Sequence, residues 1–226
     1  MKPILIAATV LSITLSPLSA ATSLIVNPST NRNDFTGVVG YRFTSTNAAT
    51  EINFVGFIDQ GSNGLNSSHA VGLYMWNGSN YELMRSATVA AGTGATLHNG
   101  YRWASIPSIT LSNTGVTFWV VAAQVINGDG DGWGDEAQSG VTGSMGTLDS
   151  AIGELNLAPG AAGYYDVGAT TISSPNLTFG GPQGFYSFYN AGNIATAIPE
   201  SSVAALGCLS GLAFLRRRRT NHPSAQ

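Results

Sequence analysis

The sequence predicts an all-β protein whose main body is an antiparallel, jelly-roll-like β-sandwich. Short runs rich in β-branched and aromatic residues recur along the middle of the chain, separated by Gly, Asn, Ser and Pro. No stretch of useful length has the periodicity of an amphipathic helix. Only 9% of the residues are charged and 28 are glycines, a composition common among exported β-rich proteins.

The first two expected strands alternate apolar side chains between their faces. In EINFVGFID, Ile52 and Phe54 are expected on one face, with Val55 and Phe57 on the other. In the earlier run GVVGYRFT, three large residues share one face: Val39, Tyr41 and Phe43.

The next runs predict a hairpin and then a central strand. HAVGLYMW and YELMRSATVA flank Asn77-Gly78, and Asn-Gly tolerates the positive φ that tight hairpin turns require. YRWASIPSITL predicts a further strand. VTFWVVAAQV is almost wholly apolar, as expected of a strand buried on both faces, and Trp119 within it is expected in the core.

The remainder of the body carries a weaker strand signal. GYYDVG, PNLTFG and GFYSFYN predict closing strands, whereas GTLDSAIGELNLAPG is compatible with a strand or one short helix. The residues that follow, NAGNIATA, have the composition of a linker. The expected organisation is a signal peptide (1–21), a β-sandwich (22–190), a linker (191–198) and a C-terminal tail (199–219).

The N-terminus has the layout of a secretory signal peptide. Lys2 precedes an apolar run over 4–15, Pro17 interrupts it, and small residues follow. Cleavage by signal peptidase after Ala20 or Ala21 fits this pattern. The alternative, a retained membrane anchor, fits less well because the run is short and ends at a proline.

The C-terminal tail predicts a marginal membrane span. Residues 202–215 are small or apolar, and as a helix they would be about 21 Å long. A hydrocarbon core is about 30 Å thick, so such a helix crosses with local thinning and arginine snorkelling. The four arginines at 216–219 are expected to remain cytoplasmic. The body would therefore be exported as a membrane-anchored precursor.

The same tail resembles the PEP-CTERM sorting signal of Gram-negative-type bacteria. The resemblance rests on Pro199-Glu200, the short apolar helix and the arginine cluster, namely Arg216, Arg217, Arg218 and Arg219. It implies recognition by an exosortase, cleavage near Pro199-Glu200 and delivery to the cell surface or an exopolysaccharide matrix. Ser201 replaces the proline expected after Glu200, which bears on the efficiency of processing. The tail is also similar to a motif named for ice-binding proteins, which implies nothing about ice.

A second resemblance covers 41–121. GYRFT, the long run from VGFIDQ to RSATV, GYRWASI and ITLSNTGVTFWVVA follow the order of β-sandwich domains of unknown function found in PEP-CTERM proteins. This resemblance implies a fold and a sorting route, and it implies no activity.

The segment NGDGDGWGDEAQ has the rhythm of a calcium loop. Oxygen donors alternate with glycines, as required to curl a backbone around a hard cation. It resembles the loops of dockerin and thrombospondin type-3 repeats, although Gln138 stands where a bidentate acid is expected. The alternative is a solvated acidic loop. The candidate Ca²⁺ ligands are Asn127, Asp129, Asp131, the Trp133 carbonyl and Asp135.

Two other site types remain open on the sequence. Six aromatics could stack on sugar rings, although aromatics on strands are usually core: Tyr74, Trp76, Tyr81, Tyr101, Trp103 and Trp133, the last expected to be the most exposed. Four acids could serve glycoside hydrolysis: Glu51, Asp59, Glu82 and Glu154. His69 and His98 lack a metal partner at helical or strand spacing, and His69 is expected to make a turn hydrogen bond.

Composition narrows the functional classes. The formal net charge is −3, and without the arginine cluster the body is clearly acidic, which argues against nucleic-acid binding. Cys208 is the one cysteine, so no intrachain disulfide forms. We therefore expect a non-catalytic structural or binding component of the bacterial envelope or exopolysaccharide. The alternatives are a calcium-assisted carbohydrate-binding module and, less favoured, a secreted glycoside hydrolase.

Overall fold

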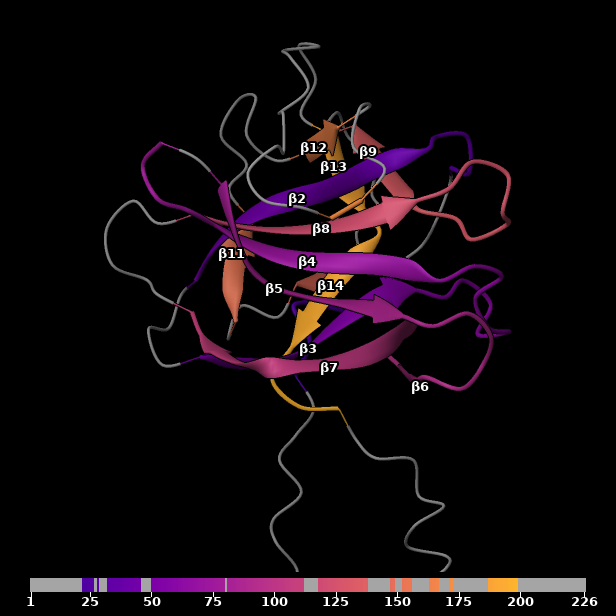
Figure 1. The fold of residues 1–226 in the computed structure, drawn as a ribbon, viewed down its shortest axis with the longest axis horizontal. Coiled ribbons are helices and arrows are strands. Elements are labelled where there is room, and N and C mark those ends of the chain that lie inside the picture. The colour runs from indigo at the N-terminus through magenta and orange to yellow at the C-terminus, as the bar shows by residue number, and fades with distance from the viewer. Residues whose placement is uncertain are drawn as a thin grey trace, which may run out of the picture.

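The structure is a computed structural model, and it describes residues 22–26, 28, 32–45, 50–79, 81–111, 118–137, 147–148, 152–155, 163–166, 171–172 and 187–198. Throughout these ranges every regular element is a β-strand, and each strand pairs antiparallel to its neighbours (Figure 1). The predicted all-β class is confirmed for this part of the chain.

Two antiparallel sheets form most of the body and lie against one another (Figure 1). In the larger sheet the order is β11-β2-β8-β4-β5, and β12 also pairs with β2. This arrangement places β8 between β2 and β4. The strands of the larger sheet are β2 (Gly37–Ser45), β4 (His69–Trp76), β5 (Tyr81–Val89), β8 (Trp119–Val125), β11 (Gly153–Leu155) and β12 (Gly163–Asp166).

The smaller sheet has the order β14-β3-β7-β6, and two short ribbons, β1-β10 and β13-β9, accompany the two sheets. Together they are consistent with a β-sandwich. The smaller sheet comprises β3 (Glu51–Ile58), β6 (Thr96–His98), β7 (Tyr101–Thr110) and β14 (Gly192–Ala195). The ribbons comprise β1 (Ile25–Val26), β9 (Gly134–Ala137), β10 (Thr147–Leu148) and β13 (Ser187–Asn190).

The main core fills the space between the two sheets. The predicted inward face of β2 is confirmed, since Val39, Tyr41 and Phe43 are all buried in it. β8 is buried on both faces, as predicted: Val121 joins the main core, whereas Val120 joins a second cluster with Val38, Tyr74, Tyr81 and Ala122. Trp119 is also buried.

The hairpin expected around Asn77-Gly78 is present as β4 and β5. Gly78 has φ of 96°, which is the conformation that made glycine the expected residue there. The segment GTLDSAIGELNLAPG contributes the short strands β10 and β11, and GYYD and SFYN form β12 and β13. The expected strand PNLTFG lies outside the described residues.

The face assignment expected for β3 is wrong in its first half. The pairing with β7 shifts register between Ile52 and Phe54, so a β-bulge interrupts the alternation. One additional residue reverses which side chains face the core. Ile52 is therefore buried together with Val55 and Phe57, while Phe54 is only partly buried.

The expected linker over 191–198 is also wrong, because it contains a buried strand. β14 pairs with β3, with Ile194 opposite Val55, and all four of its residues are buried. The segment looks polar because it contains Asn193. The side chain of this residue hydrogen-bonds to the backbone of Ile25, as a neighbouring strand would. It accepts a hydrogen bond from the Ile25 N–H (3.1 Å) and donates one to the Ile25 carbonyl (2.8 Å).

The two ends of the described body lie side by side. The Leu24 N–H donates to the Ile194 carbonyl and the Thr196 N–H donates to the Thr22 carbonyl, each at 2.9 Å. The predicted signal peptide (1–21) and sorting tail, including the expected helix over 202–215, lie outside the described residues. Within the described ranges, no helix has the length and apolarity needed to cross a membrane.

Candidate functional site

The predicted calcium loop connects β8 to β9. Gly128 and Gly130 have φ of 76° and 91°, so the turns expected of these glycines are present. A β-carbon at Gly130 would lie 2.8 Å from Asn66 Nδ2, so a larger residue would have to displace the Asn66 side chain. The Asp131 N–H donates to Asp129 Oδ1 (2.9 Å), which fixes the two acids relative to each other.

The loop does not gather all five expected calcium ligands. Asn127 is exposed, and its backbone N–H donates to Thr36 Oγ1. The Trp133 carbonyl accepts a hydrogen bond from the Arg32 N–H (3.0 Å) as part of a β-bridge. The backbone of Asp135 belongs to β9, and its side chain lies outside the described residues. The backbone of the second half of the loop is therefore engaged in strand pairing and does not curl around a cation.

Trp133 was expected to be exposed, and this expectation is wrong. Its side chain is buried, with Phe35 and Tyr189 packed edge-on against the ring. The guanidinium of Arg32 covers the ring at 4.7 Å from its centroid. The β-bridge between Arg32 and Trp133 thus uses the Trp133 carbonyl and also places the indole ring in the core.

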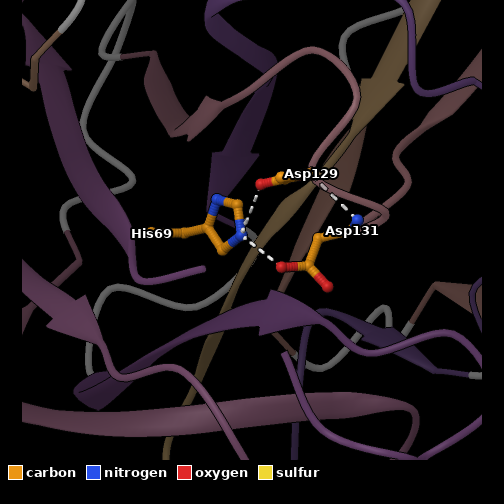
Figure 2. Close-up of side chains that lie close together, drawn as sticks. All are labelled: His69, Asp129 and Asp131. Carbon is orange, nitrogen blue, oxygen red and sulfur yellow. Dashed lines mark hydrogen bonds and ion pairs between the residues drawn. The ribbon is translucent and has the colours of Figure 1, made fainter. Parts of the chain in front are cut away.

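His69 completes a group that sequence spacing did not predict. It is the first residue of β4, its side chain is fully buried, and its ring stacks on Phe57 at 3.7 Å. Nδ1 lies 2.9 Å from the Gln124 carbonyl, and Nε2 lies 3.0 Å from Asp131 Oδ2 and 3.6 Å from Asp129 Oδ2 (Figure 2). His69 thus contacts the acidic loop and does not make the turn hydrogen bond expected of it.

The hydrogen-bond pattern fixes the roles of the two imidazole nitrogens. A carbonyl oxygen only accepts, so Nδ1 carries a hydrogen and donates to Gln124. In a neutral ring Nε2 then presents a lone pair to two carboxylates, which is repulsive. Either a proton shared between Nε2 and a carboxylate oxygen or a metal ion bound between them would remove this repulsion.

The two carboxylates differ in how well they are satisfied. Asp131 Oδ1 accepts from the Asn66 N–H (2.9 Å), and Asp131 Oδ2 accepts from the Ser67 N–H (2.8 Å). Asp129 Oδ2 is buried and has no hydrogen-bond partner among the described residues. The exposed fractions of the His69, Asp129 and Asp131 side chains are 0%, 7% and 4%. An unsatisfied carboxylate oxygen at this depth is energetically costly.

Sheet order, which the sequence does not reveal, brings His69 to the loop. β4 and β8 are neighbours, and Val71 pairs with Ala123. The start of β4 therefore lies beside the end of β8, where the acidic loop begins. Without the strand order, the separation of 60 positions between His69 and Asp129 gives no indication of contact.

The expected sugar-stacking aromatics are mostly core residues. Trp76 is partly buried and packs against Tyr81, with ring centroids 4.7 Å apart. The other five are buried, which confirms the core alternative for them: Tyr74, Tyr81, Tyr101, Trp103 and Trp133.

Two of the carboxylates considered for glycoside hydrolysis, Glu51 and Asp59, lie too far apart to act as a catalytic pair. Asp59 is buried, and its Oδ2 accepts hydrogen bonds from Arg102 Nε (2.7 Å) and the Gly64 N–H (3.1 Å). Glu51 begins β3 whereas Asp59 follows its end, so they lie eight positions apart along an extended strand, a distance of about 26 Å. Glycosidase pairs stand about 5–10 Å apart. Glu82 is an exposed residue of β5, and the Glu154 side chain lies outside the described residues.

Comparison of the chain with protein-family models, with curated proteins and with solved structures finds no match.

Proposed function

We propose that the protein is an exported, non-catalytic component of the bacterial envelope or exopolysaccharide, sorted to its place by an exosortase. The observation that carries this proposal is that the two ends of the described body are hydrogen-bonded to each other, next to the two expected cleavage sites. Thr22, the first described residue, pairs with Thr196, only four positions before Glu200. Both cleavages would therefore fall just outside one hydrogen-bonded edge of the body.

The targeting segments supply the rest of the proposed route. Signal peptidase would remove 1–21. The helix over 202–215 and the arginine cluster at 216–219 would hold the precursor transiently in the inner membrane. An exosortase would then cut near Pro199-Glu200 and release the body to the cell surface or matrix. The released body would be a jelly-roll-like β-sandwich.

Pairing at the edge makes these two cuts compatible with folding. Ser23 forms a bridge with Ala195, and the Leu24 N–H donates to the Ile194 carbonyl. These bonds lie inside both expected cleavage points, so the two cuts would leave all the described core residues in the released body. A body attached to the membrane through one end of a buried strand is also held close to the site of cleavage.

A structural or general binding role is favoured over the calcium-assisted carbohydrate module. Of the six candidate aromatics, five are buried and cannot offer a face to a sugar. A glycan array probed with and without EDTA separates the two roles. Binding that EDTA abolishes would favour the carbohydrate module, and turnover of polysaccharide would favour the secreted glycoside hydrolase.

Fractionation in a bacterium that encodes an exosortase tests the proposed sorting. We expect the wild-type protein at the surface or in the matrix, and an uncut, membrane-bound form when the exosortase gene is deleted. Glu200→Ala should accumulate in the membrane in the same way. Glu82→Ala, an exposed acid on β5, is the matched control and should be sorted normally. Equal sorting of all forms with or without the exosortase would refute the proposal.

A further inference from the structure

We propose that His69, Asp129 and Asp131 form a binding site for a divalent transition-metal ion, with Zn²⁺ as the best-fitting ion. The metal would fasten the loop between β8 and β9 to the start of β4. This inference rests on buried side chains of the folded body and is independent of the proposed sorting route.

The spacing of the candidate ligand atoms fits tetrahedral coordination. Nε2 of His69 lies 3.0 Å from Asp131 Oδ2 and 3.6 Å from Asp129 Oδ2. Ligand atoms of all three residues lie within 4.8 Å of one another. With metal–ligand bonds of about 2.0–2.1 Å, the edge of a tetrahedron around zinc is about 3.3 Å. The two distances from Nε2 bracket this value, and the third, between the two carboxylates, is at most 4.8 Å.

Each candidate ligand is already oriented by a second hydrogen bond. His69 Nδ1–H donates to the Gln124 carbonyl, which leaves Nε2 as the metal-binding nitrogen. Asp131 is held by the backbone N–H groups of Asn66 and Ser67, and Asp129 Oδ1 accepts from the Asp131 N–H. Such outer partners are typical of metal sites because they fix the ligand geometry before the ion arrives.

An independent observation points to a cation in the middle of this group. Asp129 Oδ2 is buried without a hydrogen-bond partner among the described residues, and it is directed at His69 Nε2 (Figure 2). With a dication, the two carboxylates and the neutral imidazole sum to zero charge. With only a second proton on the ring, the group keeps a net charge of −1 in a place where no side chain is more than 7% exposed. The metal-bound state therefore balances the buried charge better.

The donor set selects the class of metal. Imidazole nitrogen suits zinc and its transition-metal neighbours, whereas calcium takes six to eight oxygen ligands. Only two side chains here provide oxygen, and the Trp133 carbonyl that a calcium loop would use is paired with Arg32. The proposed site thus shares Asp129 and Asp131 with the calcium loop predicted from sequence, and it differs from that loop in its third ligand, His69, and in its metal.

Metal titration of the full-length protein in mild detergent, prepared without a polyhistidine tag, tests the proposal. After stripping with EDTA, Zn²⁺ and Ca²⁺ are titrated separately by calorimetry, and Co²⁺ is titrated by visible absorption. We expect one Zn²⁺ per chain, a Co²⁺ spectrum of tetrahedral type, and no calcium binding at this site.

Asp129→Asn is the decisive variant because it removes one ligand while preserving the Oδ1 acceptor for the Asp131 N–H. Its amide can donate to His69 Nε2, so the metal-free variant should unfold at or above the temperature of the metal-free wild type. We expect its Zn²⁺ affinity to fall by more than about tenfold. Asp34→Asn, which alters an exposed carboxylate paired with Arg32, is the matched control and should bind as the wild type does.

Three results would overturn the proposal. They are no Zn²⁺ or Co²⁺ binding by the wild type, binding that Asp129→Asn leaves intact, and Ca²⁺ binding in place of Zn²⁺. Nitrogen-15 NMR of the wild-type histidines gives a test that needs no variant. Addition of Zn²⁺ should shift the Nε2 resonance of a buried histidine, and an unchanged spectrum would equally overturn the site.

Discussion

Ile194 offers a direct test of whether the body extends through β14. Its side chain is fully buried, and its backbone pairs with Val55 in the smaller sheet. Ile194→Ala removes three carbon atoms from the core and leaves a cavity, which costs about 2–5 kcal/mol of unfolding free energy. For a domain of this size, each kcal/mol shifts the melting temperature by about 2–4 °C. The variant should therefore melt about 4–20 °C below the wild type.

Thermal and urea unfolding of the full-length protein, followed by tryptophan fluorescence, measures this loss. Leu97→Ala is the matched control because it removes the same number of carbon atoms from a leucine that is 37% exposed. It should change the unfolding free energy by no more than about 0.5 kcal/mol. If the two variants melted together, 191–198 would be the linker that its composition indicates, and the assignment of a buried β14 would be refuted.

Three further perturbations test other parts of the structure. Arg102→Leu leaves the Asp59 carboxyl group buried without its ion-pair partner, and should cost about 3–5 kcal/mol in urea unfolding. Gly40→Ala places a carbon 2.3 Å from the Val121 carbonyl oxygen, so the variant should fail to give soluble folded protein. Burial raises the pKa of Tyr101 far above its usual range. The folded state therefore keeps its full stability below about pH 10, where the tyrosine of the unfolded chain ionises. Its stability falls as the pH rises further, because the unfolded chain can ionise this tyrosine while the folded state cannot. Tyrosinate absorbance should therefore show Tyr101 ionising only as the protein unfolds.

The two substitutions each have a control variant, and all three predictions have a contradicting result. Arg85→Leu removes an arginine that donates to backbone carbonyls, so no carboxylate in the described part of the chain loses a partner and the cost should be smaller than for Arg102. Gly94→Ala places a β-carbon in open space and should be soluble. Equal losses in the arginine pair or a soluble Gly40→Ala would contradict the packing described. So would ionisation of every tyrosine near pH 10 in protein that remains folded.

Strands with strong local patterns were predictable from the sequence. The alternation of apolar side chains in β2 reflects burial of one face, and the uniformly apolar β8 reflects burial of both faces. The Asn77-Gly78 turn follows from the tolerance of glycine for positive φ. The bulge before Phe54 was not predictable, because a single additional residue leaves the composition of β3 unchanged. The sequence of β14 resembles a polar linker because it contains Asn193. Its burial was not predictable, because Asn193 is satisfied by hydrogen bonds to Ile25, a residue far away in the sequence.

Only the part of the candidate site that lies in one continuous stretch of sequence, the acidic loop, was predictable. The glycines of the acidic loop indicated its tight turns, and Asp129 and Asp131 were identified as candidate ligands. His69 was not connected with them, because the contact depends on β4 lying beside β8 in the larger sheet. Likewise, the use of the Trp133 carbonyl by Arg32 depends on a pairing across the fold, which loop spacing does not encode.

We propose that the body is exported and cut at both ends, just outside the edge where Thr22 meets Thr196. Mass spectrometry of the terminal peptides, on protein recovered from the cell surface or matrix of a producing bacterium, tests it most directly. We expect an N-terminus at Ala21 or Thr22, a C-terminus close to Glu200, and no peptide containing the arginine cluster. Recovery of the chain from the cytoplasm with residues 1–21 and 216–219 still attached would contradict the claim.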